Sequence, residues 1–183
     1  MKWLYLSMLL PVIAVAGPEQ SPYSGQQSRP IKALSASQVK AYLEGQGMGY
    51  AKPAELNHYP GPRHVLELAG QLKLSASQLR QTRETERRMK ESASALGAQL
   101  VELERSLDEA FASGQIDDDS LAGKIMQIAE LDGQIRLAHL AAHLEMRRLL
   151  SSEQIVLYDQ LRGYGSRHSR EDHPSHEGAG HSH

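Results

Sequence analysis

The chain contains 183 residues, carries a formal net charge of −2 and has no cysteine. The lack of cysteine excludes disulfide bonds, thiolate metal sites and thiol catalysis, and the balanced charge gives no reason to expect nucleic acid as a partner. Its apolar content is mainly Leu, Ala, Ile and Met, which are typical of packed helices rather than of strands.

The first residues have the pattern of an export signal. Lys2 precedes an apolar run from Trp3 to Ala16, and the run ends in small residues that suit a signal-peptidase site. The run is shorter than the ~20 residues that cross a bilayer. We expect residues 1–16 to be a signal peptide cleaved after Ala16, with an uncleaved anchor as the alternative. No Cys follows the run, so a lipid-attached form is excluded.

Two segments near the start of the mature chain lack long helical patterns. Residues 17–33 are rich in Ser, Gln, Pro and Gly, and are predicted to be a flexible leader. Residues 45–62 include Pro53, Pro60 and Pro62, which cannot lie inside a long helix. This second segment also carries Tyr50 and Tyr59, so we expect an ordered loop that packs on the domain. Helices are expected at residues 35–44, 64–74, 78–111, 121–149 and 151–164.

The two longest of these segments carry the clearest pattern. In residues 78–111 the apolar positions alternate in steps of four and three, an a/d seam over three heptads, at Met89, Ala93, Leu96, Leu100, Leu103, Leu107 and Ala110. Residues 121–149 repeat this rhythm at Ile125, Ile128, Ile135, Ala142, Met146 and Leu149. Gly114 ends the first helix, and the acidic run 117–120 caps the second. No strand pattern occurs. We predict an all-α domain over residues 34–164, built on a long antiparallel helical hairpin with shorter flanking helices.

One pentapeptide precedes three of the expected helices. LSASQ stands at residues 34–38 and again at 74–78, and LSSEQ stands at 150–154. Its Ser suits an N-cap, and the Gln three residues later can return a bond to the cap's own N–H. We therefore predict a capping box that starts a helix at Ser35, at Ser75 and at Ser151.

These boxes also carry a resemblance to a known family. Leu-Ser-x-x-Gln repeats, the stretch GMGYAKPAELNHYPGPRHVLEL and a later HLAAH resemble the LTxxQ family of Spy/CpxP-like periplasmic chaperones, and more distantly the metal-responsive ZraP and CnrX proteins. Ser replaces the family's more usual Thr in all three boxes. The resemblance covers residues 34–164. It implies a periplasmic, hook-shaped or cradle-shaped homodimer that holds unfolded clients on a basic and apolar face without nucleotide.

The first long helix supplies candidate client-binding residues under this resemblance: Arg80, Arg83, Arg87, Arg88 and Met89. Glu84, Glu86 and Glu91 lie among them, so the alternative interpretation is a solvated face stabilised by ion pairs one turn apart. Long Arg stems can also cover apolar surface, which keeps the client-binding interpretation open.

The sequence contains nine His, and five of them lie in the predicted disordered tail, residues 165–183: His168, His173, His176, His181 and His183. Such a cluster is either a loose site for Zn, Ni or Cu, or a soluble polar tail.

His139 and His143 are spaced one turn apart, so both imidazoles lie on one helix face. His139 and Asp132 interrupt the apolar seam, and we expect each to have a partner, with Glu86, Ser92 or a dimer mate as candidates.

His64 and Glu67 form an early pair. Together with His139 and His143 it resembles the CnrX pattern, although Pro60 stands where that pattern has another His. Each of these His residues can instead be a hydrogen-bonded structural residue.

No catalytic pattern is present, and we expect the protein not to be an enzyme. HLAAH has Leu140 where a zinc protease needs its Glu, and no nucleophile elbow or phosphate loop occurs. We expect an ATP-independent periplasmic chaperone or envelope-stress protein, with a heavy-metal sensor or buffer as the alternative. It requires no cofactor, and a divalent Zn, Ni or Cu ion is the candidate ligand. The expected partners are unfolded or misfolded envelope proteins, a second copy of the chain and a membrane sensor protein.

Overall fold

The structure is a computed structural model and describes residues 21–164. The predicted signal peptide, residues 1–16, and the predicted His-rich tail, residues 165–183, lie outside the described residues.

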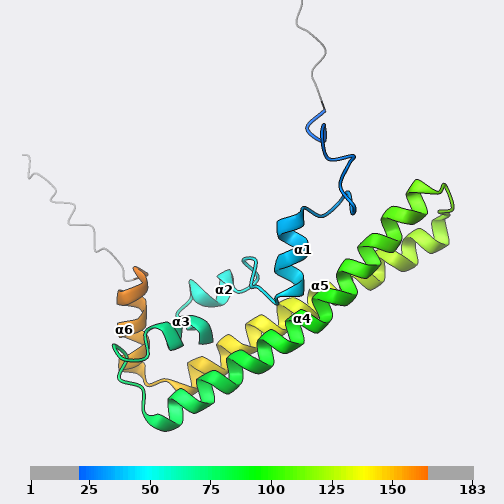
Figure 1. The fold of residues 1–183 in the computed structure, drawn as a ribbon. Coiled ribbons are helices and arrows are strands. Elements are labelled where there is room, and N and C mark those ends of the chain that lie inside the picture. The colour runs from blue at the N-terminus through cyan, green and yellow to red at the C-terminus, as the bar shows by residue number, and fades with distance from the viewer. Residues whose placement is uncertain (1–20, 165–183) are drawn as a thin grey trace, which may run out of the picture.

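The described part of the chain is all-helical, as the sequence predicts. Its elements in chain order are α1 (Ala36–Leu43), α2 (Lys52–Glu55), α3 (Pro62–Glu67), α4 (Ala76–Ala112), α5 (Asp118–Leu149) and α6 (Ser152–Arg162). None of these helices is long and apolar enough to cross a membrane. Figure 1 shows α4 and α5 as a long pair, with the short helices gathered along one side of it and α6 near one end.

The two long helices pack against each other over most of their length. Near the turn that joins them, the Lys124 ammonium donates to Ser106 Oγ over 2.6 Å. Near the other end, Arg88 of α4 pairs with Glu145 of α5 at 2.8 Å. Residues early in α4 thus meet residues late in α5, and the pair runs antiparallel (Figure 1).

The predicted apolar seam lies between α4 and α5 along most of the pair. Leu100, Ile135 and Met146 are almost fully buried there. The prediction is wrong at the turn end of α5, where Ile125 is 46% exposed. Ile125 lies in the second turn of the helix, where neither the connecting turn nor a short helix covers it.

All three predicted capping boxes are present. At Ser35, Ser75 and Ser151 the serine oxygen accepts the N–H of the third helical residue, and that residue's Gln returns a bond to the cap N–H. Asp117 and Ser120 form a fourth box at the start of α5. The repeated pentapeptide therefore acts as a helix start signal.

Two of these glutamines also bind each other. Gln78 Nε2 donates to Gln154 Oε1 over 2.8 Å, and Gln154 Nε2 approaches Gln78 Oε1 at 3.2 Å. Each amide additionally donates to a main-chain carbonyl, Leu149 for Gln78 and Leu72 for Gln154. The starts of α4 and α6 are held together by this pair.

The end of α1 lies directly on α4. A Cβ added to Gly97 would stand 2.3 Å from the carbonyl oxygen of Tyr42, so only glycine permits this approach. Gly45, which follows α1 with a φ of +61°, approaches the Lys90 carbonyl in the same way. This contact fixes where the loop after α1 crosses the long pair.

The packed part of the domain begins earlier than predicted. Ile31 is 2% exposed and packs with Leu34 and Val101. Lys32 donates to Asp108 of α4 through both its main-chain N–H and its ammonium. The last residues of the predicted leader, 17–33, therefore belong to the helical domain.

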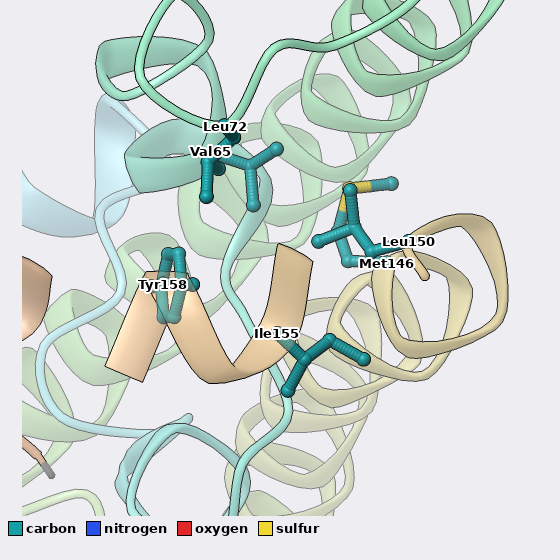
Figure 2. Packing of buried hydrophobic residues seen from close by; sticks show 6 residues of the cluster. All are labelled: Val65, Leu72, Met146, Leu150, Ile155 and Tyr158. Atoms are coloured by element: carbon teal, nitrogen blue, oxygen red, sulfur yellow. The ribbon is translucent and has the colours of Figure 1, made fainter. Parts of the chain in front are cut away.

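The largest cluster of buried apolar residues joins α3, α5 and α6 (Figure 2). Tyr158 and Val65 are completely buried in it. The helix predicted over residues 64–74 is too long, because α3 begins at Pro62 and ends at Glu67. Gly70 and the positive φ of Lys73 allow turns beyond that point, and these turns still bury Leu72 in the cluster.

Candidate functional site

A cavity of about 580 Å³ lies between the long helix pair and the loops that join α1, α2 and α3. Its walls combine the predicted histidines with charged residues from four other segments. The residues used in the argument are Glu55, His64, Met89, Lys90, His139 and His143.

His139 is buried against the cavity, and its ring stacks on Tyr50 with centroids 6.1 Å apart. Its Nε2 is buried without a hydrogen-bond partner among the described residues. Burial, and secondarily the nearby His143, lower the pKa of His139 below the ordinary value of 6.5. The imidazole is therefore held neutral, with one nitrogen free to accept a hydrogen bond or bind a metal.

Asp132, the other polar residue in the seam, accepts a hydrogen bond from the Tyr50 hydroxyl. Burial, followed by this bond, raises the pKa of Tyr50 above its ordinary value. The expected partners Glu86 and Ser92 are wrong for Asp132, because Tyr50 of the loop after α1 reaches the seam first. Glu86 does line the cavity.

His143 is also buried, and its Nδ1 lies 2.7 Å from the Tyr59 carbonyl. A carbonyl only accepts, so Nδ1 carries the proton and Nε2 has the free lone pair. Glu55 lies beside it, with Oε2 3.7 Å from His143 Nδ1. The hydroxyl of Tyr158 donates to Glu55 Oε1 over 2.5 Å, while Oε2 is buried without a partner among the described residues.

The early pair, His64 and Glu67, bond to each other at 2.9 Å through His64 Nδ1. Arg63 adds a bond to the same carboxylate at 3.1 Å. The bond from His64, and the weaker one from Arg63, lower the pKa of Glu67, which is half exposed. His64 lines the cavity with His139 and His143, but Glu67 is not among its lining residues.

Within residues 21–164, no three His, Asp or Glu side chains converge closely enough to hold a metal ion. The structure therefore brings His64, His139 and His143 to one cavity without forming a complete ligand set. The tail histidines His168, His173, His176, His181 and His183 lie outside the described residues.

The predicted client-binding arginines of α4 differ in their surroundings. Arg87 pairs with Glu84 at 2.6 Å and with Glu91 at 2.7 Å. Arg88 crosses to Glu145 of α5. Arg80 and Arg83 are exposed on the same helix. The ion-paired interpretation thus describes Arg87 and Arg88 in this structure, although their guanidinium groups stay about half exposed.

A groove of about 510 Å³ separates the end of α1 from α4. Leu43, 47% exposed, and Ala95 form its apolar wall, and Arg87 and Lys90 lie along it. Lys90 also lines the cavity, where Met48 and Met89 are its apolar neighbours. We call this continuous strip, made of Leu43, Met48, Arg87, Met89 and Lys90, the basic–apolar surface.

Two residues of the site carry no sequence signal. Glu55 lies in a Pro-rich segment whose spacing does not mark it as buried, yet it stands at the centre of the polar contacts. Gly61 approaches His143 closely, since an added Cβ would lie 3.0 Å from its ring. The tyrosines of the loop were expected to pack, but their individual partners were not predicted.

Comparison of the chain with protein-family models, curated proteins and solved structures finds no match. The functional argument therefore depends on the geometry of the chain itself.

Proposed function

We propose that this protein is an exported, ATP-independent chaperone of the periplasm that binds unfolded envelope proteins. The observation that carries the proposal is the basic–apolar surface, where exposed Leu43 and Met48 lie beside Arg87 and Lys90. An unfolded chain exposes apolar side chains next to its polar backbone, and a shallow strip of this composition can hold it without a deep pocket. The family resemblance of the sequence supports the same function.

A homodimer is part of this proposal, as is the cradle shape that the resemblance implies. A dimer would offer two copies of the basic–apolar surface to one client. Two linked surfaces raise the effective concentration of the second contact, so weak binding at each strip would hold a long client. An accessory membrane sensor that detects client load is also part of the proposal.

The test is suppression of aggregation of a chemically unfolded client at equimolar chaperone, without ATP. We expect suppression that chelator does not change. Leu43→Glu places a charge in the apolar wall and should remove most of the effect. The matched control is Val156→Glu, a side chain of α6 that is 57% exposed and lies away from the strip. If the unaltered protein leaves aggregation unchanged, or if both variants behave alike, the proposal is wrong.

A second candidate function, metal binding, is favoured by the unpaired atoms of the cavity. His139 Nε2 and Glu55 Oε2 are buried without partners, and His143 Nε2 has its lone pair free. Leaving a buried polar atom unpaired costs about 1–3 kcal/mol, which a bound ion would recover. Two imidazoles and a carboxylate suit Zn, Ni or Cu. These residues would hold the ion, which would serve as a signal or a stored cargo.

Calorimetric titration with Zn, Ni and Cu distinguishes this function from the first. We expect binding that survives deletion of residues 165–183 and is lost in His139→Ala. Binding that disappears with the tail alone would place the ion on the tail histidines and overturn the cavity site. A chaperone without this metal site would still suppress aggregation, so the two functions fail separately.

A further inference from the structure

Helix α5 has a second row of apolar residues on the face opposite its seam with α4. At about 100° per residue, one quarter of the helix surface carries Ala122, Met126, Ala129, Gly133, Leu137, Leu140 and Leu144. Met126 is 70% exposed, Leu137 is 65% exposed and Leu144 is 45% exposed. We call this row the α5 outer stripe.

No described residue covers the stripe, which runs for about 33 Å at 1.5 Å per residue. The outer face of α4 is different, because charged side chains such as Arg83, Glu84 and Arg87 occupy it. Single exposed apolar residues are ordinary, but a continuous row on a regular helix marks a contact surface. A straight row at helical spacing fits another helix better than it fits an irregular unfolded chain.

The charges beside the stripe identify that helix. Asp118 and Asp119 stand at the beginning of α5, and Arg147 and Arg148 stand at its end. Asp119 and Arg148 lie on one flank of the stripe, and Asp118 and Arg147 lie on the other. When a copy of α5 runs in the opposite direction, each flank meets the same flank of the copy. Asp119 then faces Arg148, and Asp118 faces Arg147, which also lies over the Tyr59 ring at 6.0 Å.

Both charge pairs are centred on position 133, one just before it and one just after. A Cβ added to Gly133 meets no atom within 4 Å in one chain, so two helices can approach closely there. In this register Met126 lies opposite Leu140, and Ala129 lies opposite Leu137. Large side chains thus face small or flexible ones along the stripe.

We propose that α5 pairs antiparallel with α5 of a second copy, about a two-fold axis that passes beside Gly133. The interface is self-complementary, as a two-fold dimer requires. The inference names the surface and the register of the proposed homodimer. It rests on the stripe and its charges, and it stands whether or not the protein binds clients.

Crosslinking of single cysteines tests the register, because the chain has no cysteine of its own. Met126→Cys and Leu140→Cys should crosslink to each other when mixed and treated with a short bis-maleimide. Either variant alone should crosslink much less, since its two copies stand about 21 Å apart in this register. Ala95→Cys, exposed on α4, is the control for random collision. Equal crosslinking in the mixture and in the separate variants overturns the register.

Sedimentation of the purified protein tests the interface itself. We expect a dimer at micromolar concentration, and Leu137→Glu should weaken it at least tenfold while the helical circular dichroism is kept. Val156→Glu is the exposed control on another helix. Asp119→Arg or Arg148→Asp alone should weaken the dimer about fivefold, and the double variant should restore it. A monomeric unaltered protein, or a dimer that Leu137→Glu leaves intact, would falsify the proposal.

Discussion

The contact between α1 and α4 makes a quantitative prediction for Gly97→Ala. In an exposed helix interior, replacing Gly by Ala stabilises the helix by about 1 kcal/mol. At Gly97 the new methyl would stand 2.3 Å from the Tyr42 carbonyl oxygen and 2.8 Å from its carbon. Both atoms belong to the main chain and cannot rotate away. The end of α1 would have to move by about 1 Å to restore an ordinary contact of 3.5 Å or so.

Overpacking of this kind costs about 1–3 kcal/mol, and main-chain atoms place it at the upper end. After the gain in helix propensity, we expect a net loss of about 2 kcal/mol. With a urea slope of about 2 kcal/mol per molar, the unfolding midpoint should fall by about 1 M. The assay is urea unfolding followed by circular dichroism at a fixed protein concentration.

Gly123→Ala is the matched control, because Gly123 lies inside α5 and an added Cβ meets nothing within 4 Å. Its midpoint should rise by about 0.3–0.5 M. A Gly97→Ala protein as stable as the unaltered one would refute the close approach of α1 to α4, and with it the position of the loop that forms the cavity.

Three further predictions concern polar groups of the fold. Gln78→Ala should cost about 2 kcal/mol, because it removes the cap bond and the bonds to Gln154 and Leu149, whereas Gln38→Ala removes only a cap and should cost about 1 kcal/mol; equal losses in urea unfolding would contradict the amide pair. Tyr50→Phe leaves Asp132 without its hydroxyl donor and should cost about 1–3 kcal/mol, while Tyr42→Phe, whose hydroxyl makes only a 3.4 Å contact, should cost less. The lowered pKa of His139 means that the unfolded chain binds more protons than the folded one below the ordinary value of 6.5, so metal-free protein should lose thermal stability as the pH falls from 6.5 towards 5; His139→Gln should flatten that part of the pH profile, and an unchanged profile would contradict a buried neutral ring.

Local pattern predicts the helices well in this chain, because each begins with a chemical signal and the long ones follow a repeat. Ser35, Ser75 and Ser151 all start helices where the pentapeptide places them. The α3 region is the exception. Val65, Leu68 and Leu72 have helical spacing and are all at least partly buried, but turns around Gly70 satisfy that burial without a continuous helix.

The partners of the site could not be predicted from spacing. Tyr50 reaches Asp132 across 82 positions of sequence, and Glu55 reaches Tyr158 across 103. These contacts depend on where a Gly- and Pro-rich loop crosses the helix pair, which the approach of Tyr42 to Gly97 decides. No periodicity in residues 45–62 records that crossing, so the burial of Glu55 had no local signal.

The two long helices differ in a way that connects fold to function. In α4 the apolar residues occupy one seam and charges occupy the opposite face, so a single partner helix completes it. In α5 Ile135 and Met146 face α4, while Met126 and Leu137 point away from it. A helix that is apolar on two opposite faces is stable in water only when both are covered. The seam accounts for one face of α5 within the chain, and the second face requires a helix from outside it.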